Sequence, residues 1–98
     1  MESMTAKELY DRIMNRETLN IIDVREADEV AEGKIAQAQH IAMGQIPNAI
    51  ADLNKNEHYY IICLSGSRSA AVCHFLADQG FETTNIEDGM LAWQGETA

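Results

Sequence analysis

The stretch IICLSGSRSAA, residues 61–71, places a cysteine where an apolar run ends and small polar residues begin. In the segment that follows, here called the cysteine loop (residues 63–68), Gly66 permits a turn with positive φ and Arg68 adds a permanent cation. If this loop leads into a helix, unpaired backbone N–H groups and the helix dipole would stabilise a thiolate. The pKa of Cys63 would then lie below the free value of about 8.5. Because the loop contains no histidine base, activation of this nucleophile would be electrostatic.

A free cysteine can also be a small buried hydrophobe that merely ends a strand. For Cys63 the adjoining glycine, arginine and helix start favour the nucleophile. Cys73 shares a helical face with Val72 and Leu76, which predicts a core residue. The small polar side chains of the region could donate to a bound anion or cap the helix, and they are Ser65, Ser67 and Ser69.

Two predicted elements position the cysteine loop. Tyr59 to Cys63, YYIIC, is aromatic and β-branched, which indicates a buried strand, and apolar residues recur at helical spacing from about Ser67 to Gln79. Gly80 is suited to end that helix. The loop therefore joins the carboxyl end of a strand to the amino end of a helix, where sites form in open parallel sheets.

The rest of the chain alternates in the same way. A capping box at Thr5–Glu8 predicts an early helix, and Pro47 suits the first turn of another. Further strands are predicted at residues 20–24, around 40–42 and at 83–86, with a short helix in the acidic run 26–32 and a helical turn after Gly89. This order predicts a single α/β domain over residues 1–98 with a largely parallel sheet.

Composition excludes several classes of function. The 98 residues carry a net charge of −9, which disfavours nucleic acid and anionic membranes. Neither a signal peptide nor an apolar run of membrane-spanning length is present, so a soluble, cytoplasmic protein without a disulfide framework is expected. The three histidines show no metal-ligand spacing, and no glycine fingerprint for a phosphate occurs. We expect neither a metal nor an organic cofactor.

The motifs taken together resemble the single-domain rhodanese family of sulfurtransferases. The matching segments, in order, are IIDVREADEVAEGKI (21–35), HIAMGQIP (40–47), YYIICLSGSRSA (59–70), DQGF (78–81) and IEDGMLAW (86–93). The resemblance covers nearly the whole chain. It implies a three-layer α/β domain with a central, mostly parallel sheet of about five strands flanked by helices.

The resemblance also implies a mechanism. Cys63 would attack the outer sulfur of thiosulfate or a persulfide donor, carry that sulfur as a persulfide, and pass it to a thiol or protein acceptor. The backbone amides of the loop would surround the outer sulfur, with Arg68 also near the donor oxyanion; the residues are Leu64, Ser65, Gly66, Ser67 and Arg68. An alternative is a docking or sulfur-relay module with little catalysis. The physiological donor and acceptor stay open.

Loop length and flanking residues refine the expectation. Four residues separate Cys63 from Arg68, whereas phosphatases of related fold resemble a C-x5-R loop, so a single sulfur atom is favoured over phosphate. Asp23 and Arg25 match the family's DVR element and, with Ser69, would support the site; an ion pair that ties the strand end to its neighbours is the favoured interpretation. Four residues depart from the family pattern: Lys34, Ala36, Ala42 and Asp88. The Asp88 carboxylate is expected near the pocket mouth.

Overall fold

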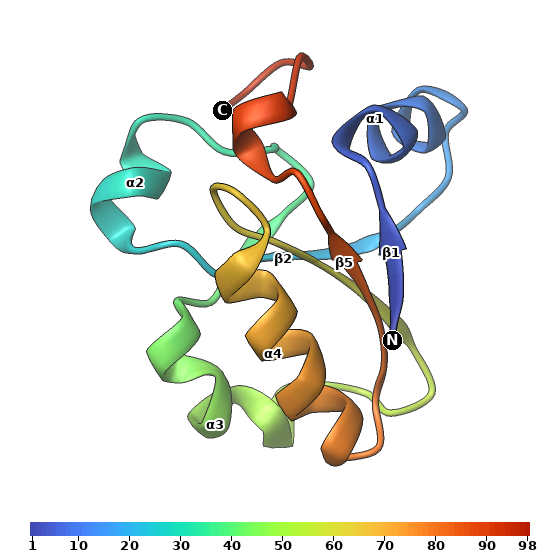
Figure 1. Ribbon diagram of the computed structural model, residues 1–98, viewed down its shortest axis with the longest axis vertical. Helices are drawn as coiled ribbons and strands as arrows, with labels where there is room; N and C mark the ends of the chain where they lie inside the picture. The colour runs from blue at the N-terminus through green and yellow to red at the C-terminus, as the bar shows by residue number, and fades with distance from the viewer.

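The computed structural model describes residues 1–98 and contains one parallel five-stranded sheet (Figure 1). The strand order is β1-β5-β4-β2-β3, and every neighbouring pair is parallel. The strands are β1 (Glu2–Met4), β2 (Asn20–Asp23), β3 (Gln39–His40), β4 (His58–Ile62) and β5 (Glu82–Ile86). All carboxyl ends therefore meet at one edge of the sheet, as the predicted largely parallel arrangement requires.

Helices cover both faces of the sheet. The α-helices are α1 (Ala6–Met14), α2 (Ala27–Ala31), α3 (Ile46–Ala49) and α4 (Ser67–Asp78), and the 3₁₀ helices are η1 (Met43–Gln45), η2 (Ile50–Asp52) and η3 (Met90–Ala92). Helices α3 and α4 lie on one face, and α1 with the C-terminal segment lies on the other (Figure 1). The expected three-layer α/β architecture is confirmed. None of these helices has the length and apolar character needed to cross a membrane.

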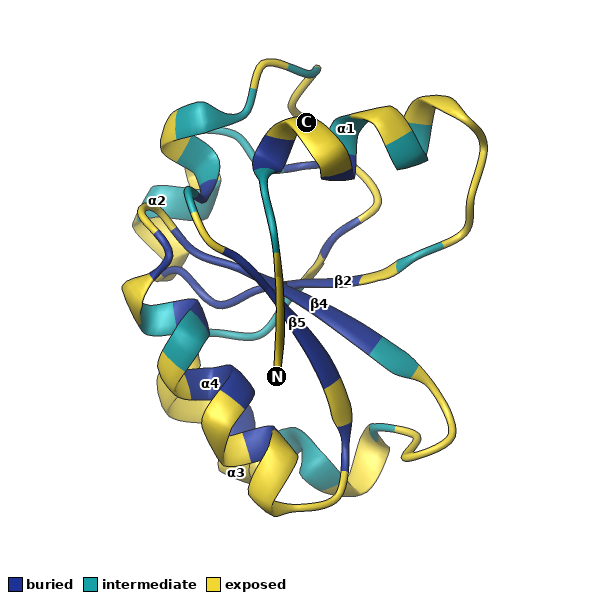
Figure 2. Cartoon of the chain, turned by 45° about the vertical axis from the view of Figure 1, so that its right-hand side comes forward, coloured by how far each residue is buried: buried dark blue, intermediate teal, exposed yellow.

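The side chains of β4 alternate between two apolar cores. Ile61 and the following Cys63 pack beneath α4, whereas Ile62 packs on the α1 side with Leu9 and Ile86. Figure 2 shows the central strands buried between exposed helix surfaces. Because β4 lies between β2 and β5 and is buried on both faces, its carboxyl end is a rigid base for the residue that follows.

Several local predictions are confirmed. Thr5 caps α1 through a capping box with Glu8, whose carboxylate accepts from the Thr5 amide. Gly80 follows α4 with a φ of +94°. Two elements differ from expectation: β1 was not predicted, and the helix at Pro47 is a single α turn that continues as η2.

Candidate active site at the end of β4

The cysteine loop is fastened through its carbonyl groups. The Cys63 carbonyl accepts from the Met90 amide at 2.9 Å, and the Leu64 carbonyl accepts from the Leu91 amide at 3.0 Å. The Gly66 carbonyl accepts from the Ala70 amide at 3.1 Å. Since these carbonyl groups bond to η3 and α4, the loop amides are left to face the other way, which is the arrangement of an anion-binding nest.

Two glycines allow this turn to pack against the segment that follows β5. Gly66 has a φ of +98°, and a Cβ atom there would lie 2.0 Å from the Glu87 carbonyl oxygen. Gly89 has a φ of +61°, and its Cβ atom would lie within 2.6 Å of the Cys63 and Leu64 carbonyl oxygens. Neither position accepts a side chain without displacing backbone, so the loop and the residue 87–89 turn are interlocked.

The Cys63 thiol accepts hydrogen bonds from the loop and from the first turn of α4. The Gly66 amide lies 3.1 Å from Sγ, and both the amide and the hydroxyl oxygen of Ser69 lie 3.3 Å from it. Burial raises the pKa of Cys63, but the hydrogen bonds from Ser69, Gly66 and Ser65 together outweigh it, and the net pKa is lowered. The geometry around the sulfur thus supplies donors that would stabilise a Cys63 thiolate.

Further amide donors remain available beside the sulfur. The amides of Leu64, Ser67 and Arg68 donate to no acceptor within the protein. Ser67 and Arg68 open α4, where the first backbone N–H groups have no partner in the helix. A second sulfur atom attached to Cys63, or an oxyanion beside it, would find donors that do not have to break other hydrogen bonds.

Asn85, at the end of β5, belongs to this hydrogen-bond network although the sequence analysis did not identify it. Its side-chain Oδ1 lies 2.5 Å from the Ser69 hydroxyl oxygen, and its Nδ2 donates to the Gly66 carbonyl at 3.2 Å. Asn85 is buried. A buried side-chain amide near the carboxyl end of β5, one strand away from the cysteine, is the signal that could have identified it.

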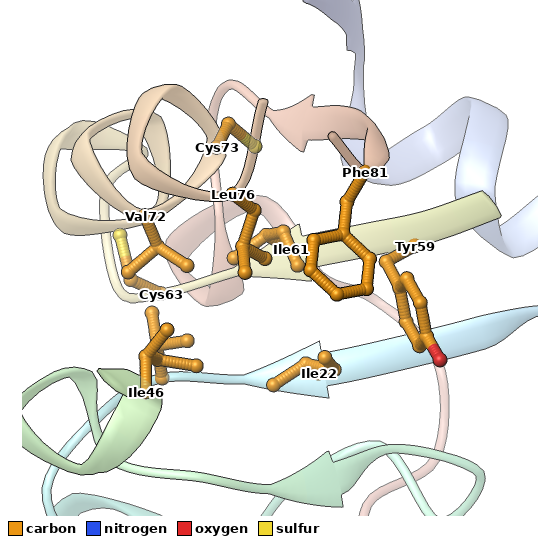
Figure 3. Close-up of a cluster of buried hydrophobic side chains, with 10 residues drawn as sticks. Ile22, Ile46, Tyr59, Ile61, Cys63, Val72, Cys73, Leu76 and Phe81 are labelled. Atoms are coloured by element: carbon orange, nitrogen blue, oxygen red, sulfur yellow. The ribbon is translucent and has the colours of Figure 1, made fainter. Parts of the chain in front are cut away.

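Cys73 lies in the same apolar cluster as Cys63 but has no comparable donors (Figure 3). Burial raises the pKa of Cys73 to about 11, and the Thr83 hydroxyl only partly offsets this effect. The prediction that Cys73 is a core residue is confirmed by its complete burial.

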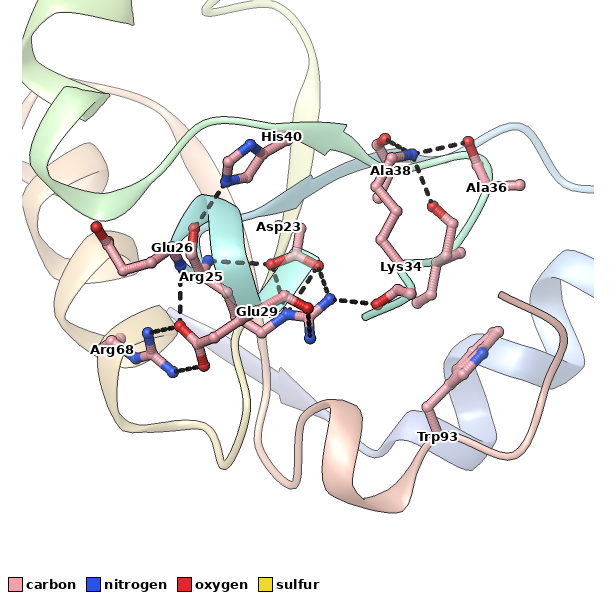
Figure 4. Close-up of polar contacts among 12 residues, drawn as sticks. Asp23, Arg25, Glu26, Glu29, Lys34, Ala36, Ala38, His40, Arg68 and Trp93 are labelled. Atoms are coloured by element: carbon pink, nitrogen blue, oxygen red, sulfur yellow. Dashed lines mark hydrogen bonds and ion pairs between the residues drawn. The ribbon is translucent and has the colours of Figure 1, made fainter. Parts of the chain in front are cut away.

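Asp23 and Arg25 form a buried ion pair next to the loop (Figure 4). Three guanidinium contacts to the Asp23 carboxylate measure 2.8 to 3.1 Å. Arg25 also donates to the carbonyl groups of Glu29 and Gly33, so it ties the end of β2 to the middle of α2 and to the turn that follows this helix. The favoured structural interpretation of this pair is confirmed.

Arg68 meets a partner that the sequence analysis did not assign. Its Nη1 and Nη2 donate to the two carboxylate oxygens of Glu29 on α2 at 2.6 and 2.8 Å. The acidic run 26–32 has the charge pattern of a solvated helix face, but Glu29 is an exception, because its side chain is only 26% exposed. Hydrogen bonding to Arg68 lowers the pKa of Glu29 to about 2, and the same contact raises that of Arg68.

Two of the residues that depart from the family pattern have structural partners. The Asp88 carboxylate accepts from the Ala6 amide at 2.7 Å and so caps the first turn of α1. The Lys34 ammonium donates to three carbonyl groups, those of Ile35, Ala36 and Ala38 (Figure 4). Lys34 thus closes the turn after α2 through its side chain.

The cysteine loop forms a small concave turn rather than a cleft. None of the five surface cavities is lined by residues 63–68. Leu64, Ser65 and Ser67 are exposed at the mouth of the loop, and the thiol lies beneath them. Such a site matches one small anionic atom better than a large organic ligand.

The fold and the site together define a class of parallel α/β domains in which backbone amides hold a cysteine after the central strand. Within that class, the chain belongs to the rhodanese-like domain family, whose sequence profile matches residues 5–96.

Relatives and solved structures agree with this assignment. A Bacillus subtilis (strain 168) protein named "Putative sulfurtransferase YtwF" is 50% identical over 97 residues, which cover 99% of this chain and 94% of that protein. "Putative sulfur carrier protein YrkF" from the same organism is 38% identical over 88% of this chain and 47% of its own length. A crystal structure of a rhodanese-like domain protein from Staphylococcus aureus has a TM-score of 0.91 and 42% identity, covering 98% of this chain and 93% of that one. The chain is thus a rhodanese-like domain by family, and its relatives include proteins named as a putative sulfurtransferase and a putative sulfur carrier.

Proposed function

We propose that this protein transfers a sulfane sulfur from a small anionic donor, such as thiosulfate or a persulfide, to a thiophilic acceptor through a persulfide on Cys63. The observation that carries the proposal is the set of N–H donors directed at the Cys63 sulfur, with further unpaired amides beside it. The similarity to proteins named as a sulfurtransferase and a sulfur carrier supports the same chemistry.

The first step is a displacement at sulfur. The Cys63 thiolate attacks the outer sulfur of thiosulfate, a new S–S bond forms, and the bond to the sulfonate sulfur breaks with both of its electrons leaving on sulfite. The charges balance, because a thiolate and a dianion become a persulfide anion and sulfite dianion. No proton moves in this step, which agrees with a site that contains hydrogen-bond donors and no general base.

The second step reverses the roles of the sulfurs. An acceptor thiolate or cyanide attacks the outer sulfur of the persulfide, and Cys63 leaves as a thiolate. Since a good leaving thiol has a low pKa, the same hydrogen bonds that lower the pKa of Cys63 assist this step. The amides of Leu64, Ser67 and Arg68 would stabilise the outer sulfur between the two steps.

Intact mass spectrometry tests the proposal. The reduced protein is incubated with thiosulfate, its mass is measured, and cyanide is then added. We expect a gain of one sulfur atom located on Cys63, followed by its loss as thiocyanate. The matched variant Cys63→Ser should show no gain, and a wild-type protein that stays unmodified by thiosulfate and by an organic persulfide would refute the proposal.

A second candidate function is a docking or relay module for another protein. It is favoured by Leu64 and Leu91, which are 38% and 72% exposed and are joined through a backbone hydrogen bond beside the loop. A partner protein that binds wild type and Cys63→Ser equally well would support docking, whereas binding that requires the persulfide would make the protein a sulfur relay.

A further inference from the structure

The guanidinium of Arg68 is occupied. Both of its terminal nitrogens donate to the Glu29 carboxylate, at 2.6 and 2.8 Å, in the paired geometry that an oxyanion of a donor would otherwise adopt (Figure 4). The two side chains are 29% and 26% exposed, so neither is a freely solvated surface group. The edge of the Arg68 guanidinium that would bind an anionic sulfur donor is therefore already occupied by Glu29.

Glu29 is fixed by contacts that do not involve Arg68. Its Oε1 accepts from the Glu26 amide at 2.9 Å, which caps the start of α2. Its backbone carbonyl accepts from Arg25, and Arg25 is held by the buried Asp23. The carboxylate is thus anchored to the end of β2, and it holds the guanidinium in place rather than following it.

The local charge follows from these contacts. With Cys63 ionised, the thiolate and Glu29 contribute two negative charges and Arg68 contributes one positive charge. The whole chain has a net charge of −9, so the long-range field of the protein does not compensate the local excess of one negative charge. A dianionic donor is therefore opposed more strongly than a monoanionic one as it approaches the loop.

We propose that Glu29 is a positioning residue that sets donor selectivity by occupying Arg68, so that the site favours sulfur donors of lower negative charge over thiosulfate. The inference rests on the proposed sulfur transfer. Glu29 acts through Arg68 and touches neither the donor nor the Cys63 sulfur.

Two donors that differ by one charge test this inference. Thiosulfate is a dianion, and methanethiosulfonate carries the same outer sulfur on a methylsulfonyl group with a single charge. Attack by the Cys63 thiolate transfers that sulfur from either donor and releases sulfite or methanesulfinate with the bonding electron pair. Steady-state transfer to cyanide gives kcat and KM for each donor.

The informative variant is Glu29→Gln, because glutamine can still accept from the Glu26 amide while losing the charge that pairs with Arg68. Glu32→Gln is the matched control, since it removes the same charge from the same segment and Glu32 has no ion pair. We expect Glu29→Gln to raise kcat/KM for thiosulfate about 5- to 10-fold, mainly through KM, and for methanethiosulfonate about 2-fold. Glu32→Gln should change both by less than about 2-fold.

A double-mutant cycle shows whether Glu29 acts through Arg68. In an Arg68→Gln background, Glu29→Gln should have a smaller effect on thiosulfate than in the wild type, because it then removes only the charge of Glu29 and releases no guanidinium toward the donor. Equal changes for the two donors, a higher KM for thiosulfate, or an unchanged Glu29→Gln effect without Arg68 would each overturn the inference. If one of these results is found while the wild type still turns over either donor, only the role of Glu29 is refuted and the proposed sulfur transfer stands. If no donor forms a persulfide on Cys63, the proposed sulfur transfer is itself refuted. Circular dichroism and thermal unfolding confirm that each variant is folded.

Discussion

Cys63 and Cys73 are both free, both fully buried and both part of one apolar cluster, yet their pKa values move in opposite directions. Burial raises the pKa of each thiol. Only Cys63 lies at the junction of a strand and a helix, where two amides donate to its sulfur and the Ser69 hydroxyl lies within hydrogen-bond distance of it. The comparison shows that backbone donors, rather than exposure, distinguish a buried thiol whose pKa is lowered from one whose pKa is raised.

Exchanging each sulfur for oxygen gives the largest contrast. Cys63→Ser should reduce sulfur transfer to the uncatalysed background with little change in stability, because its hydroxyl keeps the loop donors as partners. Cys73→Ser should keep transfer near the wild-type rate but lose about 1–3 kcal/mol of unfolding free energy, since it buries a hydroxyl in an apolar environment. Cyanide-coupled turnover and urea unfolding measure the two effects. Transfer retained by Cys63→Ser would contradict the account.

Adding one methyl group to the loop is expected to have the next largest effect. Gly66→Ala should destabilise the protein by about 2 kcal/mol or more and reduce transfer, because the new Cβ atom meets the Glu87 carbonyl and φ is +98°. Gly44→Ala is the matched control, as no atom lies within 4 Å of a Cβ at that position. Thermal unfolding compares the stability of the two variants. Equal losses of stability would show that the close packing of Gly66 against Glu87 does not stabilise the fold.

Removing the hydroxyl group that contacts each cysteine should have a smaller effect. Ser69→Ala should raise the pKa of Cys63, because the hydrogen bond from the Ser69 side chain is one of the interactions that lower it. Thr83→Val is the counterpart and should raise the pKa of Cys73 further, since the Thr83 hydroxyl lowers it. NMR titration of ¹³Cβ-labelled cysteine measures both pKa values. A Cys63 pKa unaffected by Ser69→Ala would leave the backbone amides as the sole cause.

The smallest expected effect is the acid dependence of the ion pair beside the loop. The pKa of Glu29 is lowered from 4.5 to about 2 by Arg68, so its contribution to stability is complete above 4.5 and is lost as the pH falls toward about 2. The stability difference between wild type and Glu29→Gln should shrink across this interval by less than about 1 kcal/mol, because the pair is partly exposed. Urea unfolding at several pH values measures this stability difference. If the difference between wild type and Glu29→Gln does not change with pH, the ion pair adds no stability.

The order of strands and helices could be predicted from sequence where local signals are strong. The capping box at Thr5, the apolar run before Cys63 and the helix ending at Gly80 are short-range patterns, and each is present in the fold. The edge strand β1 was missed because its residues Glu2–Met4 are largely exposed and show no apolar alternation. Its pairing with β5 is a long-range contact that local patterns do not reveal.

Partners that lie far apart in the chain account for the missed parts of the site. Glu29 and Arg68 are 39 positions apart, and Asn85 reaches Ser69 from the next strand. Helical spacing alone made Glu29 indistinguishable from its solvated acidic neighbours. The partner of Asp88 was missed for the same reason, because it is the amide of Ala6 near the other end of the chain.

The most direct test of the central claim is a titration of both thiols by NMR with ¹³Cβ-labelled cysteine, which requires no reagent to reach a buried sulfur. The account predicts that the Cys63 resonance titrates below the ordinary value of about 8.5, whereas the Cys73 resonance titrates near 11. If Cys63 titrates at or above the ordinary value, burial outweighs the loop donors, and the proposed activation of Cys63 is contradicted.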